Sequence, residues 1–172
     1  MAGKVVLITG ASSGLGELMA YEYAKLGAYL AIIATRKSES RLKQVAERAR
    51  ELGSPDVLFM FADVSKIDEC RMFVDETIQR FGRLDHLVCN AGIGPLNSIN
   101  NDVTKFVPVM DLRDAVPTME AEPCVKAVVD GIRKGATSIT EPRFFNTLIL
   151  IKLIFPRLHY MFFNSFSPLV EN

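Results

Sequence analysis

The feature that most constrains the fold is a glycine-rich loop between an apolar run and a helical segment near the start of the chain. Residues 4–9 (KVVLIT) form a short, β-branched run of the kind found in buried parallel strands. Gly10, Gly14 and Gly16 follow, and residues 14–26 are rich in helix formers. A strand, a glycine turn and a helix in this order predict a βαβ unit whose loop comes close to a phosphate.

The same alternation continues through the first ninety residues. Three more apolar runs predict buried strands, and segments with helical periodicity separate them. The order β-α-β-α-β-α-β predicts an α/β fold: a Rossmann-type doubly wound parallel sheet, incomplete, with four βα units and a C-terminal helical segment. The predicted strands are 29–34, 57–62 and 84–89, and the helices are 42–52 and a segment that ends at Gly82 and opens with a capping box at 65–68.

The pattern changes after Asn90. Glycines and prolines interrupt residues 91–119, a helix is expected from Glu122 to Gly135, and residues 136–140 are a candidate short strand. The expected organisation is a cofactor-binding Rossmann part at 1–111 and a C-terminal segment at 112–172, with an apolar tail at 144–166.

Composition excludes several classes of protein. Lys plus Arg and Asp plus Glu number 20 each, so no basic excess indicates a nucleic-acid binder. Three separated cysteines and two histidines show no ligand spacing, so neither a disulfide scaffold nor a metal site is expected. The N-terminus lacks signal-peptide features and no apolar run is long enough to span a membrane, which favours a soluble intracellular protein.

The spacing of the loop glycines, T-G-x-x-x-G-x-G, resembles the short-chain dehydrogenase/reductase family. Asp63 in Ala-Asp-Val and Asn90 in Asn-Ala-Gly match two further motifs of that family, in order, over residues 3 to about 111. Residues 2–28 and the segment TEPRFF at 140–145 most resemble its plant 11-beta-hydroxysteroid dehydrogenase-like (steroleosin) branch. The resemblance implies a nicotinamide-dependent oxidoreductase acting on alcohols or ketones such as steroids.

The end of the second predicted strand bears on the choice of cofactor. NAD sites place an acid there, whereas this chain has Thr35-Arg36-Lys37 and no acid before Glu39. Arg36 suits a 2′-phosphate, so NADP(H) is the expected cofactor; the alternative is a solvated loop pair. From the loop and from the resemblance, the candidate cofactor-binding residues are Gly10, Ser12, Ser13, Gly14, Leu15, Gly16, Arg36, Lys37, Asp63, Val64, Asn90, Ala91 and Gly92.

The catalytic groups that the resemblance implies are not found where they are expected. The family uses a Tyr-x-x-x-Lys pair with a serine and an asparagine, about 60 residues after the Asn-Ala-Gly motif. Tyr160 has no lysine four residues later. Tyr21 and Lys25 have the Tyr-x-x-x-Lys spacing, but they lie in the helix that begins at the glycine loop, so an ordinary helix-surface pair is the expected interpretation. We expect no catalytic residue here, because a block of roughly 100 residues is missing between Asp111 and Leu112.

Three functions remain open from the sequence. The first is a truncated NADP(H)-dependent oxidoreductase, and the second is a non-catalytic nucleotide-binding remnant. The third is a protein of an oil-body, endoplasmic-reticulum or other membrane surface, because residues 148–157 combine apolar and basic side chains. The alternative is that these residues normally pack on the missing half of the fold. The fourth strand is expected to become an exposed sheet edge that promotes association, and the oligomeric state is left open.

Overall fold

The computed structural model describes residues 1–92, 119–141, 147, 150 and 153–154. The chain divides into two units: Met1–Ile93 with Ala121–Ala136, and Gly94–Glu120 with Thr137–Asn172. The boundary expected between Asp111 and Leu112 lies outside the described residues, as does most of the apolar tail at 144–166.

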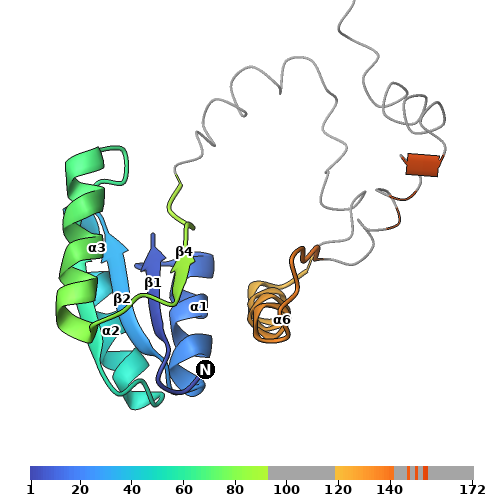
Figure 1. The fold of residues 1–172 in the computed structure, drawn as a ribbon, viewed down its shortest axis with the longest axis horizontal. Coiled ribbons are helices and arrows are strands. Elements are labelled where there is room, and N and C mark those ends of the chain that lie inside the picture. Colours follow the sequence, from blue (N-terminus) through green and yellow to red (C-terminus); the bar gives the residue numbers. More distant parts are fainter. Residues whose placement is uncertain (93–118, 142–146, 148–149, 151–152, 155–172) are drawn as a thin grey trace, which may run out of the picture. The chain divides into compact units, whose positions relative to one another are not determined.

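The first unit is built on a parallel sheet (Figure 1). Its strands are β1 (Val5–Thr9), β2 (Tyr29–Ala34), β3 (Val57–Phe61) and β4 (His86–Val88). The order across the sheet is β3-β2-β1-β4, and each neighbouring pair is parallel. The predicted doubly wound α/β fold is therefore confirmed for this part of the chain.

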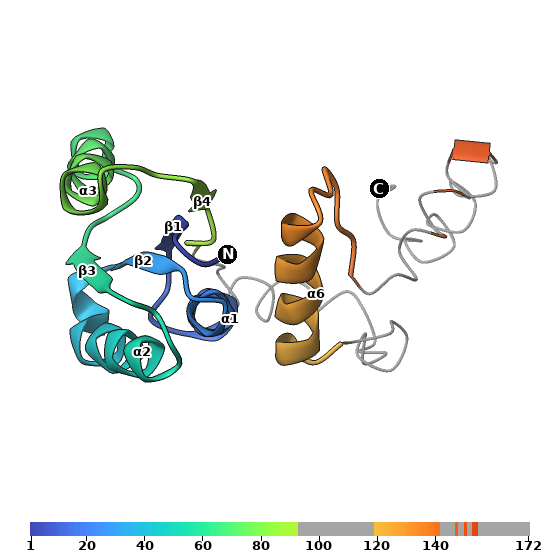
Figure 2. The same ribbon diagram turned by 60° about the horizontal axis from the view of Figure 1, so that its bottom comes forward.

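Helices cover both faces of the sheet (Figure 2). They are α1 (Gly14–Lys25), α2 (Glu39–Glu51) and α3 (Ile67–Phe81), with a short 3₁₀ turn, η1 (Arg36–Ser38), between β2 and α2. A further helix, α6 (Ala121–Arg133), belongs to the same unit. α1 and α2 lie on one face and α3 on the other, as right-handed crossovers around a parallel sheet require when the strand order reverses at β1.

The core follows the alternation of side chains along the strands. Val6 and Ile8 of β1 are fully buried in the cluster that includes α1 and α2, whereas Leu7 between them belongs to the cluster with Phe73 of α3. β1 and β2 are apolar on both faces because helices cover both.

α6 confirms the helix predicted from Glu122. Pro123 lies in its first turn, and Val125 and Val129 are buried in the same cluster as the α1 side chains. The strand considered at 136–140 is wrong, since no strand is assigned to those residues. Instead the N–H of Ala136 donates to the carbonyl of Gly131 at 3.0 Å, which ties the chain back to the end of the helix.

The capping box predicted at 65–68 is also wrong. The residue that caps α3 is Lys66, and no side chain accepts a hydrogen bond from the helix start there. The hydroxyl of Ser65 donates to Asp63 at 2.7 Å instead. The Ser65 side chain therefore makes a local hydrogen bond ahead of the helix and does not cap it.

β4 is shorter and more exposed than the buried strand predicted at 84–89. It comprises three residues, and the side chain of Leu87 is 53% exposed. In the described sheet β4 is an edge strand, as β3 is on the other side, and it is hydrogen-bonded to β1 alone. This is the exposed edge that the sequence predicts, while the association expected from it stays a prediction.

The second unit contributes few described residues. Thr147, Leu150, Leu153 and Ile154 have helical backbone, and all four are exposed. Within the part of the chain that the structure describes, no helix combines the length and apolar character that crossing a membrane requires.

Candidate cofactor site

The glycine loop joins β1 to α1 at the carboxyl end of the sheet. Gly10 and Gly14 have φ values of +69° and +61°, which favour glycine because a Cβ is strained there. Ser13 precedes α1 in an extended conformation, and its side chain makes no capping hydrogen bond. The first N–H groups of α1 have no partner within the helix, so they are donors for an anion.

Two of the three glycines are required by packing within the protein. A Cβ on Gly16 would lie 2.5 Å from Nδ2 of Asn90 and against the carbonyl oxygen of Gly10. A Cβ on Gly10 would lie 2.8 Å from Cα of Ala91. Gly14 differs, because its Cβ would meet nothing within 4 Å. Gly10 and Gly16 therefore let the loop pack on residues 90–91, while Gly14 faces open space that a ligand can approach.

Asn90 holds the loop from the end of β4. Its side-chain Nδ2 donates to the carbonyls of Thr9 at 3.0 Å and Gly10 at 3.3 Å. The backbone N–H groups of Asn90 and Ala91 both donate to the hydroxyl oxygen of Thr9 at 3.1 Å, and that hydroxyl donates to the carbonyl of Val88. Thr9 is thus a site residue that the sequence reasoning missed, although its place directly before Gly10 was a signal.

The end of β2 presents two exposed basic residues. Arg36 and Lys37 lie in η1, and the guanidinium carbon of Arg36 is 5.2 Å from the centre of the Phe61 ring. The first acid after this pair in the sequence, Glu39, pairs with Lys43 at 2.7 Å, and this hydrogen bond lowers the pKa of Glu39. The ring contact holds Arg36 at the strand end without neutralising its charge.

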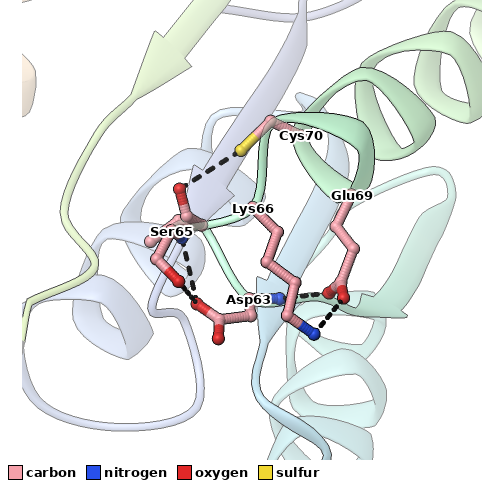
Figure 3. A network of polar contacts seen from close by, with 6 residues as sticks. Asp63, Ser65, Lys66, Glu69 and Cys70 are labelled. Atoms are coloured by element: carbon pink, nitrogen blue, oxygen red, sulfur yellow. Dashed lines mark hydrogen bonds and ion pairs between the residues drawn. The ribbon is translucent and has the colours of Figure 1, made fainter.

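Asp63 follows β3 and remains ionised. Its Oδ1 accepts hydrogen bonds from the backbone N–H of Ser65 at 3.0 Å and from the Ser65 hydroxyl at 2.7 Å (Figure 3). These two hydrogen bonds lower the pKa of Asp63, because they favour the charged form. The other carboxylate oxygen remains available as an acceptor.

The first turn of α3 fixes the backbone at Asp63. The carboxylate of Glu69 accepts the N–H of Asp63 at 2.6 Å and a hydrogen bond from Lys66 at 2.8 Å (Figure 3). The thiol of Cys70 donates to the carbonyl of Val64 at 3.4 Å. Glu69 was not predicted as a site residue, since its role depends on a contact six residues back along the chain.

The candidate residues gather at one edge of the sheet, because parallel strands bring their carboxyl ends together. Cross-strand hydrogen bonds support this edge: the N–H of Ala11 donates to Ile33, and that of Ala62 donates to Ala34. Loop residues follow β1, and the remaining candidates follow β2, β3 and β4. These are Gly10, Ser12, Ser13, Gly14, Leu15 and Gly16; then Arg36 and Lys37; then Asp63 and Val64; then Asn90, Ala91 and Gly92.

Tyr21 and Lys25 engage other partners on the surface of α1. The hydroxyl of Tyr21 donates to Glu17 at 2.9 Å, and Lys25 pairs with Glu22 at 2.5 Å. Burial and the Glu17 carboxylate raise the pKa of Tyr21 to about 12. A tyrosine that transfers a proton near neutral pH needs a lowered pKa. These contacts therefore favour the interpretation of Tyr21 and Lys25 as members of ordinary helix-surface pairs.

No three His, Cys, Asp or Glu side chains come together as a metal ion requires, within the residues the structure describes. His86 of β4 lies instead edge-on to Tyr23, with the phenol oxygen 3.3 Å from its Nδ1. These side chains join β4 to α1.

Plant proteins named 11-beta-hydroxysteroid dehydrogenase resemble this chain. 11-Beta-hydroxysteroid dehydrogenase A of Sesamum indicum is 58% identical over 114 residues, which are 65% of this chain and 32% of that protein. 11-Beta-hydroxysteroid dehydrogenase 1A of Arabidopsis thaliana is 60% identical over 111 residues, covering 63% of this chain and 31% of the relative. The chain thus spans about a third of the length of the curated relatives it matches.

Solved structures share the fold of the described part. A metagenomic short-chain oxidoreductase in complex with NADP is 30% identical with a TM-score of 0.51, over 57% of this chain and 45% of that one. NAD⁺-bound xylitol dehydrogenase is 29% identical with a TM-score of 0.50, over 54% of this chain and 34% of that one. The family model described as short chain dehydrogenase matches residues 4–120. The family match, the plant relatives and the solved structures agree with the glycine loop and the parallel sheet. The chain therefore belongs to the short-chain dehydrogenase/reductase family and resembles its plant hydroxysteroid dehydrogenase-like branch.

Proposed function

We propose that this chain binds NADP(H) at the carboxyl-end edge of its sheet and that it does not transfer a hydride. The observation that carries the proposal is the open start of α1 at Gly14 together with exposed Arg36 and Lys37 at the end of the next strand. One element offers unpaired N–H groups and the other offers cations, which are the donors that a pyrophosphate and a 2′-phosphate need.

The described residues fit such a cofactor. The N–H groups at the start of α1 would hold the pyrophosphate, and the Asp63 carboxylate would contact the adenine, as its match to the family's motif implies. Asn90 keeps the loop in place, since it ties β4 to Thr9 and Gly10. When bound, the cofactor supplies a transferable hydride, and the protein contributes position and charge.

Arg36 carries the choice between the two nicotinamide cofactors. Structural neighbours bound to NADP and to NAD⁺ both share this fold, so the fold does not decide. No acid replaces Arg36 at the strand end, and Glu39 is held by Lys43. A 2′-phosphate would therefore meet a cation there, while the Glu39 carboxylate is paired with Lys43.

Titration of the purified chain with NADPH and NADH tests this choice. We expect NADPH to bind more tightly, and Arg36→Ala to remove roughly a tenfold advantage while leaving NADH binding unchanged. Arg71→Ala is the matched control, because Arg71 is exposed on α3 and pairs with Asp68 at 3.5 Å. Equal affinity of the unmodified chain for both cofactors would contradict the assignment.

The proposal that the chain does not catalyse hydride transfer rests on the sequence that follows the Asn-Ala-Gly motif. The serine, tyrosine and lysine that the family uses have no counterparts, and the proposed gap of roughly 100 residues falls between Asp111 and Leu112. General acid/base help is worth about 10²- to 10⁴-fold, and a substrate pocket adds positioning. The substrates of a complete relative, which we take to be steroids or other alcohols and ketones, are accordingly not expected to react here.

A second candidate function is contact with a lipid surface. Leu150, Leu153 and Ile154 are 54%, 78% and 61% exposed, and their spacing puts them on one helical face. Flotation with phospholipid vesicles tests it: the chain should float, and Leu153→Glu should reduce the floated fraction. A chain that stays at the bottom of the gradient would contradict this second function.

A further inference from the structure

A depression of about 330 Å³ lies at the amino-terminal edge of the sheet, opposite the edge that carries the candidate cofactor residues. The first residues of β1 and β2, the residue directly before β3 and the end of α3 surround it. Its volume is within the range of small-molecule pockets, about 300–1,000 Å³. The aromatic and charged side chains that line it are Tyr29, Asp56, Arg80, Phe81 and Arg83.

Two aromatic rings form one wall of this depression. The ring centres of Tyr29 and Phe81 are 5.6 Å apart, and the ring planes are inclined by 50°. Among the described residues the Tyr29 hydroxyl has no hydrogen-bond partner, and no buried side-chain nitrogen or oxygen there lacks one. The hydroxyl is therefore accessible from outside, so the wall offers an apolar surface with a polar group beside it.

Two guanidinium groups stand at the same opening, and each keeps unused donors. Arg80 directs Nε and Nη2 to one oxygen of Asp56, at 2.9 and 2.7 Å. Arg83 directs Nη2 to Asp85 at 2.5 Å. The remaining guanidinium nitrogens have no acceptor in the part of the chain that the structure describes, and they can bind the oxygens of a carboxylate.

The charges around the depression favour an anion with a single charge. Its lining holds two guanidinium cations and the Asp56 carboxylate, which leave a single net positive charge. Asp85 adds little repulsion, because its side chain is only 10% exposed and Lys4 contacts it at 3.0 Å. A dianion such as a phosphate would meet the Asp56 carboxylate with its second charge.

We propose that this depression binds a small planar aromatic carboxylate, with its ring against Tyr29 and Phe81 and its carboxylate on Arg83. Arg80 and the Tyr29 hydroxyl supply further donors. The site is separate from the proposed cofactor site, because it lies at the other end of the strands. The inference therefore does not depend on the proposed function.

The experiment titrates the full chain into 2-naphthoate and follows the anisotropy of the naphthalene fluorescence. The chain has no tryptophan, so the protein contributes little background. 2-Naphthamide is the control ligand, since it has the same rings and nearly the same shape without the charge. We expect 2-naphthoate to bind at least roughly tenfold more tightly, and saturating NADP⁺ should not displace it.

Substitutions assign the parts of the site. Arg83→Gln should weaken 2-naphthoate roughly tenfold and leave 2-naphthamide unchanged, whereas Phe81→Leu should weaken both. Tyr29→Phe keeps the ring and should cause a smaller loss, for 2-naphthoate more than for 2-naphthamide. Arg71→Gln is the matched control, because it removes the same charge from α3 outside the depression, at a residue paired with Asp68.

Four outcomes overturn the inference: no binding of 2-naphthoate, equal affinity for the two ligands, displacement by NADP⁺, or losses of equal size in Arg71→Gln and Arg83→Gln. Urea midpoints of each variant separate lost binding from lost structure. Lys4 still contacts Asp85 when Arg83 is replaced, so the fold should remain. If Arg83→Gln unfolds, Tyr29→Phe decides, and unchanged affinity for 2-naphthoate in that variant overturns the inference.

Discussion

The two neighbours of β1 in the sheet are held to it by different forces. β2 is buried along nearly its whole length, because helices cover it on both faces. β4 is three residues long, and its central side chain, Leu87, is 53% exposed. The β2 side of the sheet is therefore stabilised by burial of apolar side chains. The β4 side depends more on polar contacts.

Polar contacts at its two ends join β4 to β1. Before the strand, Asp85 accepts hydrogen bonds from the N–H of Val5 at 2.9 Å and from Lys4 at 3.0 Å. After it, Asn90 donates to the carbonyls of Thr9 and Gly10. The less buried side of the sheet thus carries Asn90, one of the candidate cofactor residues. A substitution there should therefore change both the stability of the fold and the affinity for the cofactor.

Truncating a buried side chain of β2 should have the largest effect. Ile32→Ala removes a side chain with no exposed surface and should lower the free energy of unfolding by about 2–5 kcal/mol. Leu87→Ala on β4 should lower it by less than about 1 kcal/mol. Urea denaturation measures both, and similar losses would contradict the contrast between the two strands.

Substitution of Gly16 tests the packing of the loop on the end of β4. Gly16→Ala places a Cβ 2.5 Å from Nδ2 of Asn90 and should destabilise the fold by about 1–3 kcal/mol and weaken NADPH binding. Gly92→Ala is the control for stability, because its Cβ would meet nothing nearer than 4.0 Å. Equal unfolding midpoints for the two variants would refute the close packing.

Loss of the Asn90 donor should have a smaller effect. Asn90→Ala removes two hydrogen bonds to the loop and should lower the free energy of unfolding by about 1–2 kcal/mol. Asn90→Asp should lose as much, because a carboxylate cannot donate to carbonyls. Full stability of the aspartate variant would show that side-chain donation does not hold the loop.

The smallest effect should depend on pH. Hydrogen bonds, first from Arg83 and then from the N–H of Val5, hold the pKa of Asp85 well below its usual range. A lowered pKa in the fold contributes stability that is complete above about pH 4 and is lost as the pH falls toward the lowered value.

Unfolding of the unmodified chain and Asp85→Asn should therefore differ by a constant amount near neutral pH. The difference should shrink in acid below about pH 4. Urea midpoints across this range measure it. A difference that grows in acid would contradict the role of Asp85 at β4.

Much of the fold could be predicted because the strands and helices have strong local patterns. β2 has the predicted bounds, and α3 ends at Phe81, directly before the predicted stop at Gly82, where φ is +74°. β4 was predicted too long, since the N–H of Val5 donates to the Asp85 side chain and the N–H of Asn90 donates to the Thr9 hydroxyl, where a longer ladder would need cross-strand backbone carbonyls. These hydrogen bonds join residues about 80 positions apart in the chain. The local periodicity of the sequence carries no information on such contacts.

The residues of the candidate site could be predicted where the local sequence itself explains why a given residue type is needed. Gly10 and Gly16 follow from the turn and its packing, and Arg36 follows from its place after a strand. Thr9 and Glu69 were missed, because their roles arise from tertiary neighbours: the end of β4 and the backbone at Asp63.

The central claim is that the chain binds NADPH without transferring its hydride. The direct measurement adds a steroid or aliphatic ketone to the NADPH-bound chain and follows nicotinamide fluorescence and absorbance together. The account predicts the fluorescence change of binding and an absorbance that stays constant, also in Tyr21→Phe. Turnover near the common value of about 10 s⁻¹ would contradict it, and loss of that turnover in Tyr21→Phe would make Tyr21 the acid.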